Sequence, residues 1–368
     1  CSGVFKNSVK EELIAIGDSA LFWNGVGANP QTQSATENVA IGSTSLRNNT
    51  AAYQNTAVGS YTMINNNYGS RNSAFGAGTL VENTEGNNNT AIGFFSLSSN
   101  TGANDNSALG TYALRKNVSG FSNVAVGVNA LRENIDGNEN NAFGVKALNS
   151  NLSGYSNTAV GDEALYTNQS GNGNTGVGYE ALFSNVSGNY NVGLGWQALW
   201  TATGDDNVAC GQYAGPYGYT PWINNTGAYG KYAVTTADNQ IRIGWVDAVS
   251  IGGYVNWSNL SDKRYSKGIS ENIPGLDFIL KLRPITYQLD VNKLENYYGS
   301  SRQGLGDKFY QASLKVKEST IQSGFIAQEV EKVAKSIGYD FSGIDPAKNE
   351  HDSYGLRHAE FVVPLVKA

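Results

Sequence analysis

Asn157-Thr158-Ala159-Val160-Gly161-Asp162-Glu163-Ala164-Leu165 is one copy of a unit that recurs through much of the chain. The unit reads Asn, a small or polar residue, Ala, an apolar residue, Gly, two variable residues, Ala and Leu. Its Gly recurs every 17 residues from Gly42 to Gly195. Gly211 follows after 16 residues, and an earlier copy at Gly17 precedes Gly42 by 25. A short fixed period of this kind indicates an architecture of stacked repeats.

The unit also carries an Asn seven residues after its first Gly and, in most copies, a second Gly ten residues after it. A helix would be weakened by two Gly, and the unit is too short for two helices and a turn. It favours one coil of a parallel β-solenoid with two short strands and two turns. We expect the Ala-apolar-Gly triplet to form one strand and the Ala-Leu pair to begin the second.

The repeat chemistry suits such coils. Gly permits positive φ and close backbone approach at corners, and equivalent Asn side chains stacked on one another can form amide ladders. No Pro, which would remove a donor from the sheet, occurs from residue 31 to residue 215. Each coil offers only small apolar side chains, so we expect several chains to share one core.

This repeat resembles the head repeats of trimeric adhesins of the autotransporter type, over roughly residues 14–215. The resemblance implies a left-handed parallel β-roll in which three chains pack together. Residues 1–13 are an N-terminal segment before it.

Residues 216–260 break the period and are interpreted as a capping and connecting β segment. Pro216 and Pro221 enter here, and a weaker echo of the repeat lies at residues 225–230. Residues 239–244 and 249–253 alternate like short strands. A terminal segment of this kind would close the open end of a solenoid core.

Residues 261–368 have the composition of a small α+β domain. Residues 277–282 predict a helix that ends before Pro284, and residues 285–289 alternate like a strand. Residues 324–334 predict a strand that runs into an amphipathic helix, and residues 359–368 are typical of the start of another helix.

This domain resembles the C-terminal intramolecular chaperone of endosialidase-type phage tailspikes, over about residues 259–368. The matching pieces are Ser261-Asp262-x-Arg264, Ile273-Pro274-Gly275-Leu276, Leu282-Arg283-Pro284-Ile285-Thr286-Tyr287, Gly324-Phe325-Ile326-Ala327-Gln328-Glu329-Val330 and the tail from Tyr354 to Ala368. The resemblance implies a domain that trimerises, sets chain register and helps the upstream β-structure fold. In many members it then cuts itself off. Interchain β-structure folds slowly, which is the problem that such a domain addresses.

In that family the serine of the Ser-Asp-x-Arg motif attacks the bond before it, and a lysine five residues on acts as base. The resemblance therefore assigns Ser261 as nucleophile on the Leu260–Ser261 bond, with Asp262 and Arg264 completing the motif. Ser266 stands where the family has its lysine, so Lys267 is the candidate base. The alternative is that Ser261 and Asp262 cap a turn and Lys267 is a solvated surface lysine.

Composition excludes several other classes. A net charge of −6 without a basic region disfavours a nucleic-acid partner, and no apolar run is long enough to span a membrane. The two cysteines, Cys1 and Cys210, form neither a disulfide framework nor a zinc pattern. Cys1-Ser2-Gly3 would suit a lipidated bacterial lipoprotein, or it is an arbitrary boundary. His351 and His358 lack further ligands nearby, so we predict no metal and no cofactor.

Aromatic residues at variable repeat positions raise the question of a glycan-binding face: Tyr112, Tyr155, Tyr166, Tyr179, Tyr190, Trp196 and Trp200. The alternative is interchain packing or scattered exposure, and a glycan-degrading enzyme would need paired carboxylates that the repeats lack. The sequence thus favours a homotrimeric extracellular fibre or adhesin, on a bacterial cell surface or a virion. A self-cleaving fibre precursor and a surface glycan-binding or glycan-degrading protein are the alternatives.

Overall fold

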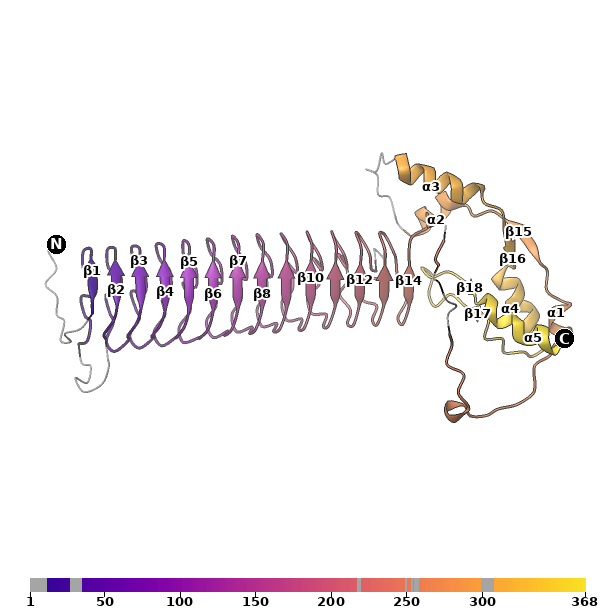
Figure 1. The fold of residues 1–368 in the computed structure, drawn as a ribbon, viewed down its shortest axis with the longest axis horizontal. Coiled ribbons are helices and arrows are strands. Elements are labelled where there is room, and N and C mark those ends of the chain that lie inside the picture. The colour runs from indigo at the N-terminus through magenta and orange to yellow at the C-terminus, as the bar shows by residue number, and fades with distance from the viewer. Residues whose placement is uncertain are drawn as a thin grey trace. The chain divides into compact units, whose positions relative to one another are not determined.

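The computed structural model describes residues 12–26, 35–216, 220–248, 250–252, 254, 258–298 and 308–368, with side chains of the last range from residue 311. The chain divides into two compact units, residues 1–242 and 243–368. The first is a parallel β-solenoid and the second is a small α+β region, which confirms the predicted fold class (Figure 1).

Among the described residues, fourteen strands of three residues each form one sheet in chain order. They are β1 (Ile14–Ile16), β2 (Val39–Ile41), β3 (Thr56–Val58), β4 (Ser73–Phe75), β5 (Thr90–Ile92), β6 (Ser107–Leu109), β7 (Val124–Val126), β8 (Asn141–Phe143), β9 (Thr158–Val160), β10 (Thr175–Val177), β11 (Val192–Leu194), β12 (Val208–Cys210), β13 (Gly227–Tyr229) and β14 (Ile241–Ile243). The last two strands come from the predicted echo of the repeat and from residues 239–244. Of the other predicted strand, Val249 and Gly253 lie outside the described residues, and residues 250–252 form no strand.

The sequence period is the strand register. Thr158 of β9 pairs with Thr175 of β10, and Val160 pairs with Val177. The strand is therefore the polar-Ala-apolar triplet, and the corner Gly follows it. The prediction of a second strand at the Ala-Leu pair was wrong: these residues lie in a turn, and Leu165 has a φ of 52°. That left-handed backbone curls the chain and cannot extend it as a strand would.

One chain closes its own narrow core. The middle Ala of the strand and the Leu of the turn point inward in successive coils, as Ala159 and Leu165 do, and both are fully buried. The expectation of a core shared between chains was wrong for these side chains. The third residue of the strand, the apolar one, lies on the outer surface instead.

Two ladders of buried Asn line this core and confirm the predicted amide stacking. In the first, Asn134 donates from Nδ2 to Oδ1 of Asn117 in the preceding coil at 2.7 Å and to the carbonyl of Gly137 at 2.9 Å. In the second, Asn140 donates from Nδ2 to the carbonyl of Gly154 at 2.8 Å, while its Oδ1 accepts from the backbone N–H of Asn157 at 3.1 Å. Each coil is thus hydrogen-bonded to its neighbours through its interior.

The two Gly of the repeat are required for different reasons. Gly161 has a φ of 130°, which a residue with a side chain rarely adopts. At Gly137 the obstacle is space, since a Cβ would lie 2.5 Å from Oδ1 of Asn134 and closer still to the carbonyl oxygen of Gly154. The corner at Gly161 and the Asn ladder at Gly137 therefore both require a residue without a side chain.

The second unit consists of short elements: η1 (Lys263–Tyr265), α1 (Leu276–Ile279), β15 (Ile285–Tyr287), α2 (Val291–Tyr297), α3 (Lys308–Ser319), β16 (Gln322–Gly324), α4 (Ala327–Ser336), β17 (Ile344–Asp345), β18 (Gly355–Leu356), η2 (His358–Phe361) and α5 (Val362–Lys367). The predicted strand at residue 285, the strand and helix after residue 320 and the C-terminal helix are confirmed. The first predicted helix is present but short. Helices α2 and α3 were not predicted.

A compact aromatic core holds this unit together. Phe278 of α1 is fully buried and contacts Tyr339, Phe341 and Phe361, with ring centroids 5.2, 4.9 and 6.4 Å away. Val330 and Ala334 of α4 complete the cluster. The core joins α1, α4 and the C-terminal helical segment, which are far apart in the sequence.

Candidate functional site

The outer face of the solenoid sheet carries an unbroken row of apolar side chains, one per coil. We call it the outer apolar row: Ile16, Ile41, Val58, Phe75, Ile92, Leu109, Val126, Phe143, Val160, Val177, Leu194, Cys210, Tyr229 and Ile243. Leu109 is 47% exposed and Phe143 is 41% exposed. In the described strands neither the first nor the third position holds a charged residue. Such a long uncharged surface is typical of an interaction site.

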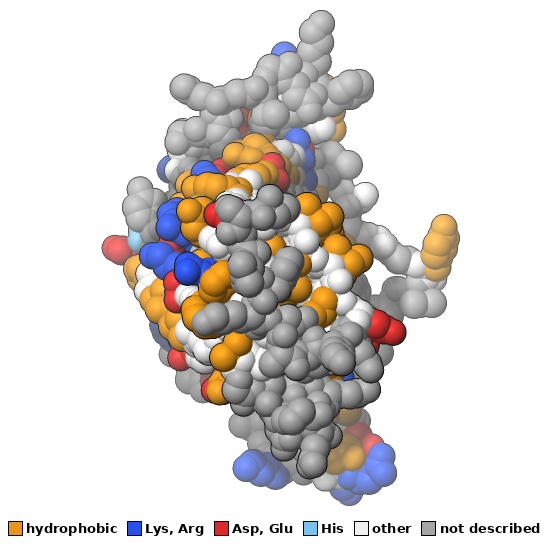
Figure 2. All heavy atoms as spheres, turned by 90° about the vertical axis from the view of Figure 1, so that its left-hand side faces the viewer, with side chains coloured by type: hydrophobic (Ala, Val, Ile, Leu, Met, Phe, Trp, Pro, Cys, Tyr) orange, Lys and Arg blue, Asp and Glu red, His pale blue; other side chains and the backbone are white. Residues whose placement is uncertain are grey.

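Figure 2 views the molecule from the N-terminal side of the solenoid and shows hydrophobic side chains at the surface, with charged side chains among them. Charged side chains occur at the turns, where they pair between coils. Lys146 donates from Nζ to Glu163 Oε1 at 2.7 Å, which raises the pKa of the lysine above its ordinary value. Lys116 pairs with Glu133 in the same way. The turns therefore carry charged side chains together with exposed apolar ones, as Lys146 and Val145 show, whereas the first and third strand positions are uncharged.

The seven aromatic residues of the glycan hypothesis occupy five different positions of the coil. Several stack on aromatic neighbours one coil away. Tyr179 and Trp196 are 6.0 Å apart with nearly parallel rings, and Tyr166 is 5.2 Å from Phe183. Tyr155 and Tyr190 are exposed singly at other positions. The structure does not bring the seven residues together on one face.

In the second unit the structure joins the sequence pieces that carry the family resemblance. Strand β15, from the Leu-Arg-Pro-Ile-Thr-Tyr piece, pairs antiparallel with β16, which ends at Gly324. Arg283 binds Glu329 of α4 with two hydrogen bonds, at 2.5 Å from Nη2 and 3.0 Å from Nε. These bonds hold the pKa of the Glu329 carboxyl below its ordinary value.

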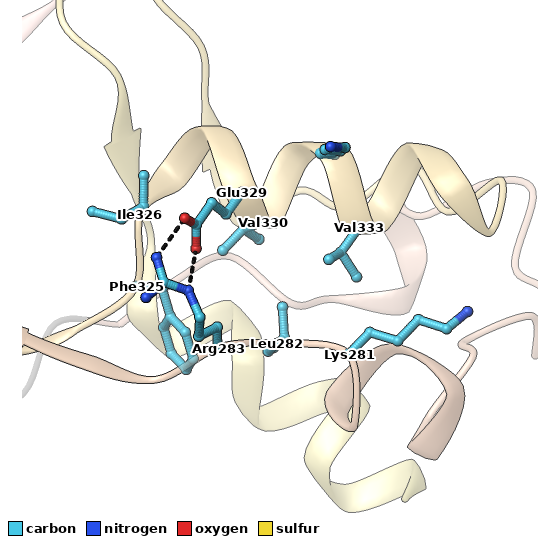
Figure 3. Close-up of a pocket in the computed structure, with 9 residues that line it drawn as sticks. Lys281, Leu282, Arg283, Phe325, Ile326, Glu329, Val330 and Val333 are labelled. Carbon is cyan, nitrogen blue, oxygen red and sulfur yellow. Dashed lines mark hydrogen bonds and ion pairs between the residues drawn. The ribbon is translucent and has the colours of Figure 1, made fainter.

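A small cavity of about 150 Å³ lies beside this ion pair. Figure 3 shows Leu282, Val330 and Val333 facing one another across it, with the two dashed bonds of Arg283 and Glu329 at one end. Phe325 and Ile326 also line it. Lys281 and Lys332 also line it, so the cavity has an apolar centre with charged side chains around it.

Helices α1 and α5 expose many apolar side chains for so small a unit. Leu280, at the end of α1, is 77% exposed and Val366 is 83% exposed. Leu276, Val362, Val363 and Leu365 are also exposed. A Cβ on Gly275 would lie 3.0 Å from the carbonyl oxygen of Lys367, so the two helices approach closely there. We call these six side chains the α1–α5 apolar patch.

Ser261 lies in an exposed segment without strand or helix, immediately before η1. Asp262 caps η1 by accepting from the backbone N–H of Arg264 at 2.9 Å, and it also binds the guanidinium of Arg264 at 2.5 Å. These bonds lower the pKa of Asp262 below its ordinary value. The two supporting residues of the motif are therefore brought together, with their side chains engaged to each other.

Ser266 and Lys267 follow η1. Ser266 donates from Oγ to the carbonyl of Asp262 at 3.2 Å, which closes the turn. Ser261 and Lys267 are both exposed, and in the described part of the chain neither has a side-chain hydrogen bond. Leu260, on the other side of the candidate bond, is 82% exposed. The Leu260–Ser261 bond is thus in an exposed segment, and Ser261 as nucleophile with Lys267 as base stays a prediction.

The described residues contain neither a metal-binding cluster nor a helix that could span a membrane. No group of three or more His, Cys, Asp or Glu side chains among them is placed to hold a metal ion. None of their helices is both long and apolar enough to cross a membrane. Cys1 lies outside the described residues, and Cys210 is a free, exposed thiol within the outer apolar row.

Comparison with known proteins finds one similarity, in the second unit. Residues 261–339 match the family model described as chaperone of endosialidase, which confirms the resemblance inferred from the motifs. The match begins at Ser261 and includes the Arg283–Glu329 pair. No curated protein and no solved structure matches the chain.

Proposed function

We propose that this chain is one subunit of a trimeric extracellular fibre, borne on a virion or a bacterial surface, and that its C-terminal unit drives folding and assembly. One observation carries the proposal: a chaperone-of-endosialidase match directly follows a long parallel solenoid with an uncharged apolar outer row. A chain that exposes such a row gains by covering it with identical copies, because their rows have the same length and spacing.

The α1–α5 apolar patch supports the same proposal from the other unit. Its side chains are exposed in one chain, and burying them between chains would release water from a large apolar area. The patch has a second property that suits assembly: it is held against the aromatic core through Phe278 and Phe361, so it is presented by a folded unit.

The test is the native mass of the full chain in solution, measured by light scattering. We expect three times the 39.2 kDa of one chain. The double variant Leu280→Gln and Val366→Gln should weaken association by about 100-fold or more, since two apolar contacts are lost. Glu318→Gln, an exposed change on α3, is the control. A monomeric parent, or a double variant that associates like the parent, would contradict the proposal.

Self-cleavage at Leu260–Ser261 is the second candidate, favoured by the exposed Leu260 and by a family match that begins at Ser261. Oγ of Ser261 would attack the Leu260 carbonyl carbon while Lys267 takes the hydroxyl proton. The C–N bond would break as that proton passes to the Ser261 amine, and water would then hydrolyse the ester.

Intact mass under denaturing conditions tests this step. We expect fragments ending at Leu260 in the parent, full-length chain in Ser261→Ala, and slowed cutting in Lys267→Ala. Full-length mass in both the parent and Ser261→Ala would show that the bond stays intact.

Two partner hypotheses remain beside these. A glycan bound on the fibre is favoured by exposed rings such as Tyr179 and Trp196, which are 44% and 40% exposed. A lipid on Cys1 follows from the sequence alone. Binding of labelled surface polysaccharide by the parent, compared with Tyr179→Ser and Trp196→Ser, tests the first.

A further inference from the structure

The exposure of the side chains changes sharply near the start of the second unit. Residues 244–248 are half-buried. The described residues from 250 to 272 are exposed, with only Asp262 half-buried among them. We call this exposed stretch the strap. The half-buried stretch before it contacts another part of the unit.

That contact is with α2 and α3. The Trp245 ring lies 5.8 Å from the ring of Tyr298, which directly follows α2, at an angle of 59°. Lys317 of α3 donates from Nζ to the backbone carbonyl of Ala248 at 2.7 Å, in a partly buried hydrogen bond. We call these four residues the junction clasp. Trp245 and Tyr298 are 53 residues apart in sequence, and Ala248 and Lys317 are 69 apart. Both contacts therefore join residues on opposite sides of the strap.

The receiving surface belongs to the folded body of the unit. Tyr298 shares a hydrogen bond of 2.9 Å between its hydroxyl and that of Ser353. Tyr297 donates to the carbonyls of Glu350 and Asp352, at 3.0 and 2.9 Å. These bonds attach the end of α2 to the loop that precedes β18. A segment seated on Tyr298 is therefore attached to more than a single helix.

We propose that the junction clasp is a second, non-covalent attachment that keeps residues 261–368 bound to the shaft after the strap is cut. A cut anywhere in the strap leaves Trp245 and Ala248 on the shaft piece, and Tyr298 and Lys317 on the other piece. None of the clasp contacts involves a strap residue, so cutting removes none of them. The surface formed by α2 and α3 is thus a docking site for residues 244–248 of this chain.

Charged groups also lie near the clasp. Asp247 lies close to Glu295 of α2, and burial together with this second carboxylate raises the pKa of Glu295. Lys317 is the cation of the clasp. The clasp thus combines an aromatic contact and a charged hydrogen bond with one repulsive pair, so we expect a moderate attachment that single substitutions can release.

The test uses the full chain with Ser261→Ala, so that it does not depend on self-cleavage. A recognition sequence for a site-specific protease is inserted after the exposed Gly268. After complete cutting, the two pieces are separated by size under native conditions and identified by mass. We expect the C-terminal piece to co-elute with the shaft.

Two variants then address the clasp itself. Trp245→Ala should weaken retention about 30-fold, and Lys317→Met, which keeps the aliphatic stem, about tenfold. Lys315→Met on the exposed side of the same helix is the matched control and should behave like the parent. Circular dichroism before cutting confirms that each variant is folded. Release of the C-terminal piece in the parent would overturn the proposal. Retention in both clasp variants that equals retention in the parent would also overturn it.

Discussion

The solenoid and the C-terminal unit solve the problem of a small core in opposite ways. In the solenoid most coils repeat the same inward Ala, Leu and Asn, and hydrogen bonds between coils satisfy the buried amides. The C-terminal unit has one aromatic cluster around Phe278 and leaves apolar side chains such as Leu280 exposed. The first region is specified by its register, and the second by a few long-range contacts. Substitutions should therefore act differently in the two.

The largest effect is expected from Gly137→Ala in the solenoid. The new Cβ would collide with Oδ1 of Asn134 and the carbonyl of Gly154, neither of which can move without breaking a ladder. We expect a loss of about 5 kcal/mol in the free energy of unfolding, measured as a lower thermal midpoint. Asp136→Ala, an exposed change one residue away, should leave the midpoint almost unchanged. A small shift of the thermal midpoint for Gly137→Ala would mean that the close packing of the coils at Gly137 contributes little to stability.

Phe278→Ala should have the next largest effect, and it probes the other region. Removing a fully buried ring leaves a cavity among three aromatic partners, which costs about 4 kcal/mol. Amide exchange should become faster throughout α1, α4 and α5 and stay slow in the solenoid. Val316→Ala, an exposed apolar change, is the control. Faster exchange in both units would show that the two fold as one.

Asn140→Ala should have a smaller effect than either. It removes one of the two side-chain donors to the carbonyl of Gly154, since Asn151 remains, and it leaves the backbone N–H of Asn157 without its side-chain acceptor, at a cost of about 2 kcal/mol. Asn141→Thr, which places in β8 the residue found in β9, should cost almost nothing. Amide exchange should speed up mainly in the coils next to the substitution. An equal effect of the two substitutions would argue against the ladder.

Glu295→Gln should have the smallest effect, and its sign is informative. A carboxyl whose folded-state pKa is raised destabilises the fold once it ionises, so stability falls as the pH rises from its ordinary pKa through the raised one. The amide cannot ionise, so the variant should be slightly more stable than the parent at neutral pH and no better below the ordinary pKa. Thermal midpoints at the two pH values check this, and a variant less stable at neutral pH would contradict it.

The sequence predicted most where the chain repeats. The 17-residue step predicted the strand register from β2 to β11, because one interval fixes all the pairings in that stretch. It failed at Ala164 and Leu165, since a side-chain pattern does not reveal that the Leu backbone is left-handed. The C-terminal elements could be located by their motifs, but the Arg283–Glu329 pair could not, because the two residues lie 46 positions apart.

The junction clasp could not be predicted from the sequence for the same reason. Trp245 follows the solenoid repeat and Tyr298 follows a helix that was not predicted, although Asp290 offered a capping signal for α2. Nothing in the local sequence of either aromatic residue indicates its partner. Contacts of this kind are specified by the folded unit as a whole.

The inward Asn ladders also mean that the length of the shaft can change only in steps of one coil. Because each coil is hydrogen-bonded to the next at a fixed sequence interval, a duplication or deletion of 17 residues lengthens or shortens the rod by one step, about 4.8 Å, and leaves every other step intact. Any other change in length must be absorbed in a turn, as in the single 16-residue interval before Gly211. Evolution can therefore set the reach of this protein in whole units without redesigning its core.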